Sequence, residues 1–520
     1  MTSMQPARTS RRPHFALAGI TLAILAGCAS VGPDFQAPQT SSPDAWSAWS
    51  SADPALRTGV NITAEPTTHN PQWWTVFGDA TLDALQARAA QASPDIQTAA
   101  LRFAQSRAQR TTVAAQRGPS VNATAAATRQ RQSEYSPSTR LVDAVAGDNR
   151  DDLVSLLSDP FTLYQAGFDA SWEVDLWGRV RRSVESADGS VLSSQAMLAN
   201  MQLSIQSELA RNYFELRLAQ EQLRLAQQDV ALARESLDLI EARTRAGLID
   251  EVDLVRQRAQ LADLRARLPA LSAQQAALTN QIGLLMGARP GELTAQLASP
   301  LTPVADAATP DLALGIPSEL AHRRPDILAA EGKLRSATAD IGVATADLYP
   351  RITLGASFGL ESFEGGKFGE WGSRTWQIGP SLSLPIFDQG RRRSVVVLRK
   401  LAQQEAAVSY QQTVLKAWQE IDDALTRYGA ERLRRAELQE KTRNATDAYQ
   451  LAQARYKAGA TDYLVQLDTE RTALQARRDW TDSSYQLLID RVAIYKSVAA
   501  GTEGVAAGVE RGNPPDEKPL

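Results

Sequence analysis

The side chains able to carry out chemistry are few in this chain of 520 residues. It has three histidines, His14, His69 and His322, and one cysteine, Cys28. No HExxH zinc motif is present, and Gly365-Gly366-Lys367 lacks the upstream glycine and the following Ser or Thr of a phosphate-binding loop. The chain is therefore not expected to be an enzyme, and no metal or cofactor is expected beyond a covalent lipid.

That lipid is expected on Cys28, which ends a secretion signal. Residues 8–12 contain three arginines, and Phe15 to Leu25 form an apolar stretch too short to span a bilayer. The run Leu25-Ala26-Gly27-Cys28 resembles the lipobox of bacterial lipoproteins, and a lone cysteine cannot form an internal disulfide. Cleavage before Cys28 and lipidation of its thiol are predicted; an ordinary signal with an incidental cysteine is the alternative. In the lipoprotein rule, alanine at position 29 permits transfer to the outer membrane.

Composition and charge narrow the class of protein. Ala, Leu, Gln and Arg dominate while aromatic residues make up 6%, which is typical of long helices. The formal charge is −4 and there is no basic run, so nucleic acid is not an expected partner.

A turn of one design occurs twice, 212 residues apart. Gly247 and Gly459 each end a long polar helical pattern, because glycine readily adopts the left-handed conformation that closes a helix. Asp250 and Asp462 follow three residues later and suit the N-cap of the next helix. Each copy therefore predicts the tip of a helical hairpin.

An internal duplication surrounds these tips. Helices beginning at Pro94 and Pro325 are related by an offset of 231, whereas the tips are related by an offset of 212. Between the start of its short helix and its tip, the first copy therefore has 19 more residues than the second. The surplus is expected within Arg129 to Pro160, as a longer surface loop. The predicted organisation is a signal peptide at 1–27, a lipid-anchored tether at 28–75, a first repeat at 76–300, a second repeat at 301–500 and a disordered tail at 501–520.

Four short runs alternate apolar and polar residues, and each lies between a short helical pattern and a long one. This alternation, with aromatic residues near the ends, is typical of membrane β-barrel strands with their apolar residues toward lipid. Ordinary hairpins half-buried against helices are the alternative. The expected strands are 121–128, 164–174, 352–360 and 376–386.

Long helices follow the strands, roughly 85–100 Å each at 1.5 Å per residue. Charged residues recur at every turn, so neither could span a bilayer. Leucine seams on two sides of the first predict neighbours on both sides, as in a cylinder of helices. The expected helices are 189–245 and 391–457, followed after the tips by 252–286 and 463–498.

Two N-terminal motifs carry a family resemblance. Residues 31–38, Val-Gly-Pro-Asp-Phe-Gln-Ala-Pro, and Trp73-Trp74 with Phe77, Asp79 and Leu82 resemble the opening of TolC-like outer membrane factors. The match is to the lipoprotein branch (NodT-type outer membrane efflux lipoproteins) and continues to about residue 500.

Four strands cannot close a barrel, and an open sheet edge in lipid leaves backbone groups unsatisfied. The pattern therefore requires two, three or four chains that share one barrel, and the resemblance implies three. The expected fold is an α+β membrane protein with internal duplication, in which a trimeric twelve-stranded β-barrel continues into a periplasmic helical barrel.

The resemblance implies an outer membrane channel of a tripartite efflux system. It would be a passive conduit for small amphipathic toxicants, working with a periplasmic adaptor and an inner-membrane pump of the resistance-nodulation-division type. A channel for protein or peptide secretion remains the alternative. A lipid-anchored adaptor would have one helical hairpin, and two are predicted here.

Candidate sites lie at the tips. Gly247, Gly459 and Asp250 are expected to face the adaptor, and Asp462 lies near the entrance. Asp253 and Asp468 lie beyond the caps and could form a charged ring, although Asp468 could instead pair with Arg471, three residues on. Tyr456 matches a tyrosine that takes part in closing contacts in the family.

Overall fold

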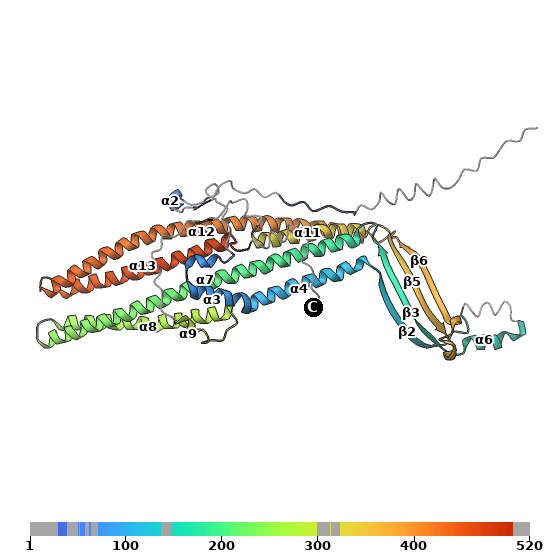
Figure 1. The fold of residues 1–520 in the computed structure, drawn as a ribbon, viewed down its shortest axis with the longest axis horizontal. Coiled ribbons are helices and arrows are strands. Elements are labelled where there is room, and N and C mark those ends of the chain that lie inside the picture. The colour runs from blue at the N-terminus through green and yellow to red at the C-terminus, as the bar shows by residue number, and fades with distance from the viewer. Residues whose placement is uncertain are drawn as a thin grey trace, which may run out of the picture. The chain divides into compact units, whose positions relative to one another are not determined.

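The computed structural model describes residues 30–38, 50, 53–57, 62–63, 71–136, 147–298, 312–313 and 323–502. The chain divides into two compact units. Its helices and strands are labelled in Figure 1. Each unit contains segments of both predicted repeats, so a repeat is not itself a compact unit. Unit 1 draws on residues 1–36, 107–190 and 334–406, and unit 2 on residues 37–106, 191–333 and 407–520.

Unit 1 contains one antiparallel sheet, in the order β2-β3-β5-β6. Its strands are β2 (Ser120–Gln130), β3 (Phe161–Val174), β5 (Arg351–Ser362) and β6 (Arg374–Ser383). This confirms the four predicted strands. The last one ends at Ser383 rather than at Ile386, since Pro385 has no amide hydrogen to continue a ladder.

The register of the sheet brings the apolar residues together on one face. Phe168 of β3 lies opposite Ala123 of β2 and Phe358 of β5, and Phe358 lies opposite Trp376 of β6. Directly paired residues point to the same face of a sheet, so the apolar positions of all four strands share a face. The opposite face carries polar pairs, among them Gln165 Nε2 donating to Glu361 Oε2 at 2.7 Å.

The insertion between β2 and β3, predicted as a loop, contains the helix α6 (Arg150–Ser158). Val154 is buried at 5% exposure, while Leu156 is 68% exposed. The sequence prediction missed this helix because nine residues hold little more than two helical turns, too few for a clear periodicity.

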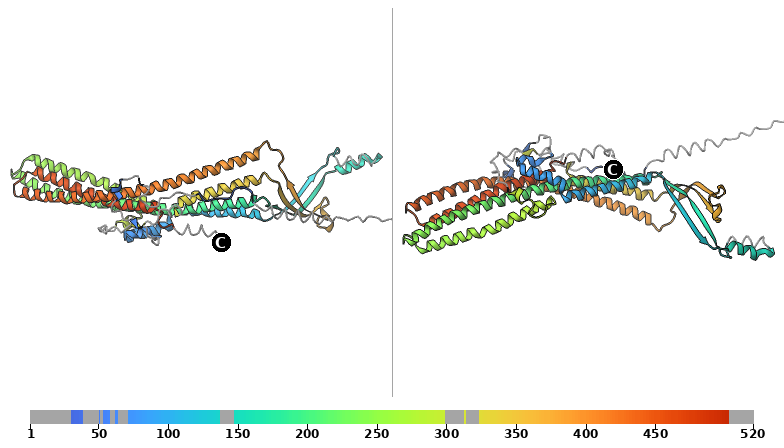
Figure 2. Two further views of the ribbon diagram at one scale, coloured as in Figure 1. Left: turned by 90° about the horizontal axis from the view of Figure 1, so that it is seen from above. Right: turned by 60° about the horizontal axis from the view of Figure 1, so that its bottom comes forward.

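The long helices match their predicted ends closely, although α7 begins ten residues before Gly189. The two helices that follow the tips lie within unit 2, and the others are divided between the two units. Figure 2 shows the helices in two further views. No helix in the described part of the chain is both long and apolar enough to cross a membrane. The helices are α4 (Pro94–Ala114), α7 (Arg179–Arg245), α8 (Glu251–Leu285), α11 (Pro325–Ala346), α12 (Arg391–Lys457) and α13 (Tyr463–Ser497).

The main core of unit 2 explains the Trp73-Trp74 motif, because both indoles are buried in it. Asp79 caps α3 (Ala80–Ala92) by accepting hydrogen bonds from the amides of Thr81 and Leu82. The same carboxylate accepts the hydroxyl hydrogen of Tyr213 at 2.5 Å. The motif therefore fixes the start of α3 against α7.

The predicted tether, residues 28–75, packs on the body where it is described. The backbone of α2 (Pro54–Arg57) lies against α12, since a Cβ on Gly429 would come within 1.9 Å of Leu56 O. β1 (Ile62–Thr63) pairs in parallel with β4 (Leu312–Ala313). Tertiary contacts therefore hold these two short segments, whose composition favours an extended chain.

Candidate functional site

The two predicted tips form as expected in unit 2. Gly247 and Gly459 have φ of +68° and +70°. Asp250 caps α8 by accepting from the amide of Val252 at 3.1 Å, which confirms that cap. Asp462 occupies the predicted N-cap position of α13, but its side chain makes no capping hydrogen bond. Its carboxylate is left on the exposed surface of the tip.

The two hairpins pack on each other beside these tips. Ile240 of α7 is buried with Tyr463 and Leu467 of α13. Tyr456 packs at the edge of this cluster, its ring centroid 5.5 Å from that of Tyr463, and the Arg243 guanidinium lies 5.2 Å from its ring. The Tyr456 hydroxyl is buried without a hydrogen-bond partner in the described structure. Tyr456 therefore joins the hairpins through its ring and not through its hydroxyl.

The two acidic entrance candidates differ in their partners. Asp253 forms an ion pair with Arg256 at 3.6 Å, and its side chain is 21% exposed. Asp468 is exposed. The alternative pairing of Asp468 with Arg471 is not formed, since Arg471 Nε donates to Gln260 Oε1 at 2.7 Å. Of the two carboxylates, Asp468 is the more available to a solute ion.

Polar contacts join α13 to the first hairpin over much of its length. We call these contacts, which were not predicted from the sequence, the interhairpin ladder. Their α13 members recur at steps of eight, seven and four residues, the spacing of one helical face, and that spacing was the available signal. The four pairs are Tyr463–Gln257 at 2.5 Å, Arg471–Gln260 at 2.7 Å, Arg478–Asp229 at 3.2 Å and Asp482–Gln222 at 2.6 Å.

Buried carboxylates accompany the ladder. Burial raises the pKa of Glu470, and the nearby charge of Asp229 raises it further against a smaller opposing effect of Arg471. Burial likewise raises the pKa of Asp229, although Arg478 opposes this. Glu470 is 7% exposed. The interface between the hairpins therefore holds carboxylates whose ionised forms are disfavoured.

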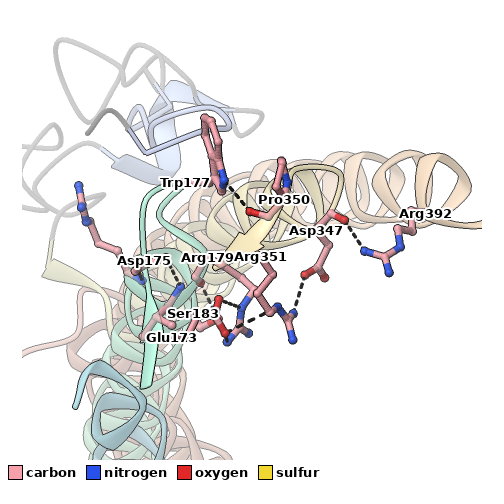
Figure 3. Close-up of polar contacts among 11 residues, drawn as sticks. Glu173, Asp175, Trp177, Arg179, Ser183, Asp347, Pro350, Arg351 and Arg392 are labelled. Atoms are coloured by element: carbon pink, nitrogen blue, oxygen red, sulfur yellow. Dashed lines mark hydrogen bonds and ion pairs between the residues drawn. The ribbon is translucent and has the colours of Figure 1, made fainter. Parts of the chain in front are cut away.

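A second polar cluster lies in unit 1, where strands meet helices, and we call it the junction cluster (Figure 3). Glu173 at the end of β3 accepts two hydrogen bonds from Arg179 in α7, both at 2.8 Å. Its Oε2 also lies 3.7 Å from Arg351 Nε in β5, and Arg351 pairs with Asp347 at 3.2 Å. Arg392 Nη1 donates to the carbonyl oxygen of Asp347 at 2.5 Å.

The junction cluster connects the two repeats, because Glu173 and Arg179 belong to the first and Arg351 to the second. Beside it, the Trp177 and Tyr349 rings stack at 4.8 Å, and Trp177 Nε1 donates to the carbonyl oxygen of Pro350 at 2.8 Å. The cluster lines a cavity of about 140 Å³. In the sequence, the only sign of this cluster is that a Gly-Arg pair occurs at 178–179 and again at 390–391, at the same offset of 212 as the tips.

Cys28, the predicted lipidation site, lies outside the described residues.

Comparison with known proteins gives consistent matches. The family model described as outer membrane efflux protein matches residues 85–288 and 316–500. Outer membrane protein OprJ of Pseudomonas aeruginosa is 32% identical over 507 residues, covering 96% of this chain and 99% of the relative. The pyoverdine export outer membrane protein OpmQ of Pseudomonas putida is 31% identical, covering 83% and 88%. The solved structure of the outer-membrane channel OprN superimposes with a TM-score of 0.80 at 34% identity, covering 91% and 99%.

The matches extend over both repeats and include the long helices and all four strands. The chain belongs to the outer membrane efflux protein family, and it is an outer membrane efflux channel with the TolC-like fold.

Proposed function

We propose that three copies of this chain form a passive conduit that carries small amphipathic toxicants through the periplasm and the outer membrane. A periplasmic adaptor and an inner-membrane pump of the resistance-nodulation-division type would supply the drive. The observation that carries the proposal is the four-stranded sheet with one continuous apolar face. Within the described residues, β2 and β6 each pair along one edge only.

Those unpaired edges support the trimer. Backbone groups at an open edge have no water to bond in a bilayer, so β6 of one chain must pair with β2 of the next. Three chains supply twelve strands. Native mass spectrometry of detergent-extracted protein should give a mass of three chains; a stable folded monomer would contradict the shared barrel.

The tips support contact with the adaptor. Leu248 beside Gly247 is 71% exposed, and Leu464 and Val465 beside the second tip are 52% and 47% exposed. Exposed apolar side chains at an ordered turn suit a protein partner. Asp468 and Asp253, with Tyr456 and Asp462 beside them, would then line the entrance.

Lipidation of Cys28 would add a second attachment to the outer membrane. Several acyl chains on one residue anchor a protein stably, whereas a single chain binds weakly. Mass spectrometry of the mature N-terminus tests this, and an unmodified Cys28 would overturn it.

Site-specific cross-linking tests the partner. A photo-reactive residue replacing Leu248 should capture an adaptor in living cells. The matched control replaces Leu284, which is 74% exposed at the other end of α8. Equal capture at both positions would contradict a tip contact.

An export assay tests the substrate class. In a host without its own outer membrane efflux channel, this chain with the captured adaptor and its pump should lower the accumulation of a fluorescent amphipathic dye. Leu248→Asp should abolish this effect and Leu284→Asp should not. Unchanged dye accumulation with a polypeptide released into the medium would favour the secretion alternative.

A further inference from the structure

Residues 30–36, which we call the N-terminal strap, occupy a site in unit 1 that is built around one buried arginine. Arg182 of α7 donates to Val31 O at 3.3 Å, to Gly32 O at 3.4 Å and to Asp34 Oδ1 at 2.7 Å. The Val31 amide donates to Trp177 O at 3.0 Å. The Arg182 side chain is 4% exposed, whereas that of Asp34 is 86% exposed. Arg182 Nη1 also donates to Glu185 Oε2 of the same helix at 2.7 Å. The strap therefore supplies the remaining acceptors of a buried guanidinium, three oxygen atoms in all.

Close backbone contact adds shape to this site. Gly32 has φ of +94°, and a Cβ there would lie 2.5 Å from Gly342 Cα in α11. A Cβ on Gly342 would in turn lie 2.7 Å from Arg182 Cγ. Phe35 places its ring 4.7 Å from the guanidinium of Arg335, also in α11. The site admits this segment because both glycines lack side chains, and it draws on both repeats.

The docked strap begins beside the junction cluster. A Cβ on Gly178, the residue before α7, would come within 2.5 Å of Ser30 Cβ. Trp177 precedes Gly178 and stacks on Tyr349. Trp and Tyr are enriched where a membrane meets water, and here β3 ends and β5 begins. Ser30 is therefore held at the level expected for the membrane interface.

We propose that Arg182, Gly342 and Arg335 form an anchor clamp, a binding site for the strap that holds the lipid-modified end of the chain at a fixed level beside the base of the strands. The proposal rests on the proposed lipidation of Cys28. Only two residue steps separate positions 28 and 30, and two extended residues span about 7 Å. A lipid on Cys28 is thereby kept beside the strands that enter the membrane. Through the strap, the lipid is connected directly to α7 and α11.

Hydrogen exchange of the full-length protein, resolved to single residues, tests whether the strap is docked. The Val31 amide should be protected, and Arg182→Ala should make it exchange at least tenfold faster. Arg181→Ala is the matched control, because Arg181 is an exposed neighbour in the same helix. If Arg182→Ala does not fold, Asp34→Asn alters the same ion pair from an exposed side chain and should also speed exchange. An unprotected Val31 in the unaltered protein would overturn the clamp.

Two insertions test what the clamp does. Ten Gly and Ser residues between Ala29 and Ser30 lengthen the path from lipid to clamp, whereas the same insertion between Thr40 and Ser41 leaves that path unchanged. The first should lower the amount of assembled trimer in the outer membrane at least threefold, and the second should not. Equal amounts from both variants would overturn the anchor role.

The mass of the mature N-terminus is measured in both insertion variants. If Cys28 is acylated but the insertion between Ala29 and Ser30 does not lower the amount of trimer, the anchor role of the clamp is contradicted and the proposed lipidation stands. An unmodified Cys28 contradicts the proposed lipidation and removes the anchor role with it, while the exchange of Val31 still reports whether the strap is docked.

Discussion

Tyr463 of α13 donates its hydroxyl hydrogen to Gln257 Oε1 of α8 at 2.5 Å, so a buried hydrogen bond joins the two helical hairpins. Gln257 is 0% exposed and Tyr463 is 3% exposed. Gln257 Nε2 also donates to the carbonyl oxygen of Ala233 in α7 at 2.8 Å. One amide side chain thereby connects three helices near the tips.

Tyr463→Phe is expected to destabilise the protein, because Gln257 Oε1 would lose its partner in a site that water does not reach. The cost should be about 1–3 kcal/mol of unfolding free energy per chain, seen as a lower midpoint of thermal denaturation. Tyr456→Phe is the control: it removes a buried hydroxyl that has no partner in the described structure, and should be neutral or stabilising. Equal losses in both variants would contradict this account.

Glu470→Gln is expected to stabilise the protein at pH 7. Burial raises the pKa of Glu470 above its ordinary 4.5, so folding favours the protonated form and the ionised form destabilises the fold above that raised pKa. This destabilisation fades as the pH falls toward 4.5. Thermal denaturation across pH 4–8 should show a gain at neutral pH that disappears in acid. Glu437→Gln, at an exposed position of α12, should give no such gradient.

Asp468→Ala is expected to reduce cation selectivity and weaken block by multivalent cations in single-channel recordings. In the proposed entrance, three symmetry-related carboxylates would attract cations. Asp253→Ala should have a smaller effect, since Arg256 already pairs with that carboxylate. Trimer yield should not change in either variant. If selectivity and block were unaltered in both, the entrance constriction would have to be formed by other residues.

Arg179→Lys is expected to weaken the junction cluster, because lysine cannot reproduce the paired hydrogen bonds to Glu173. Both side chains are about one-fifth exposed, so solvent screening should limit the loss to about 1 kcal/mol. The temperature at which the trimer dissociates in detergent is the measurement. Arg181→Lys, two residues away and exposed, should leave that temperature unchanged.

The sequence predicted elements whose cause is local. Gly247 and Gly459 ended their helices as expected, and the alternation in β3 and β5 indicated the apolar face, because a turn or a two-residue period depends only on neighbouring residues. Asp462 was predicted as a cap from its position, but position does not fix the rotamer of a side chain.

Contacts between distant segments could not be predicted in this way. Arg182 lies about 150 residues from Val31, and Tyr463 about 200 from Gln257. In each case the sequence shows a polar residue within a helical pattern, which is equally compatible with exposure to solvent. Burial of these side chains follows from helix packing, and a single sequence carries no signal that pairs one buried polar group with another.

The equal lengths of corresponding helices limit how this protein can change. α7 and α12 each have 67 residues, and α8 and α13 each have 35. Deleting one residue from α12 alone would rotate its tip by about 100° and withdraw it by about 1.5 Å relative to the tip of α7. Tyr463 would then miss Gln257. During evolution, insertions and deletions in these helices should therefore be tolerated only when both repeats change by the same number of residues. Steps near seven residues are expected, because they return the same side chains to the face that packs on the neighbouring helix.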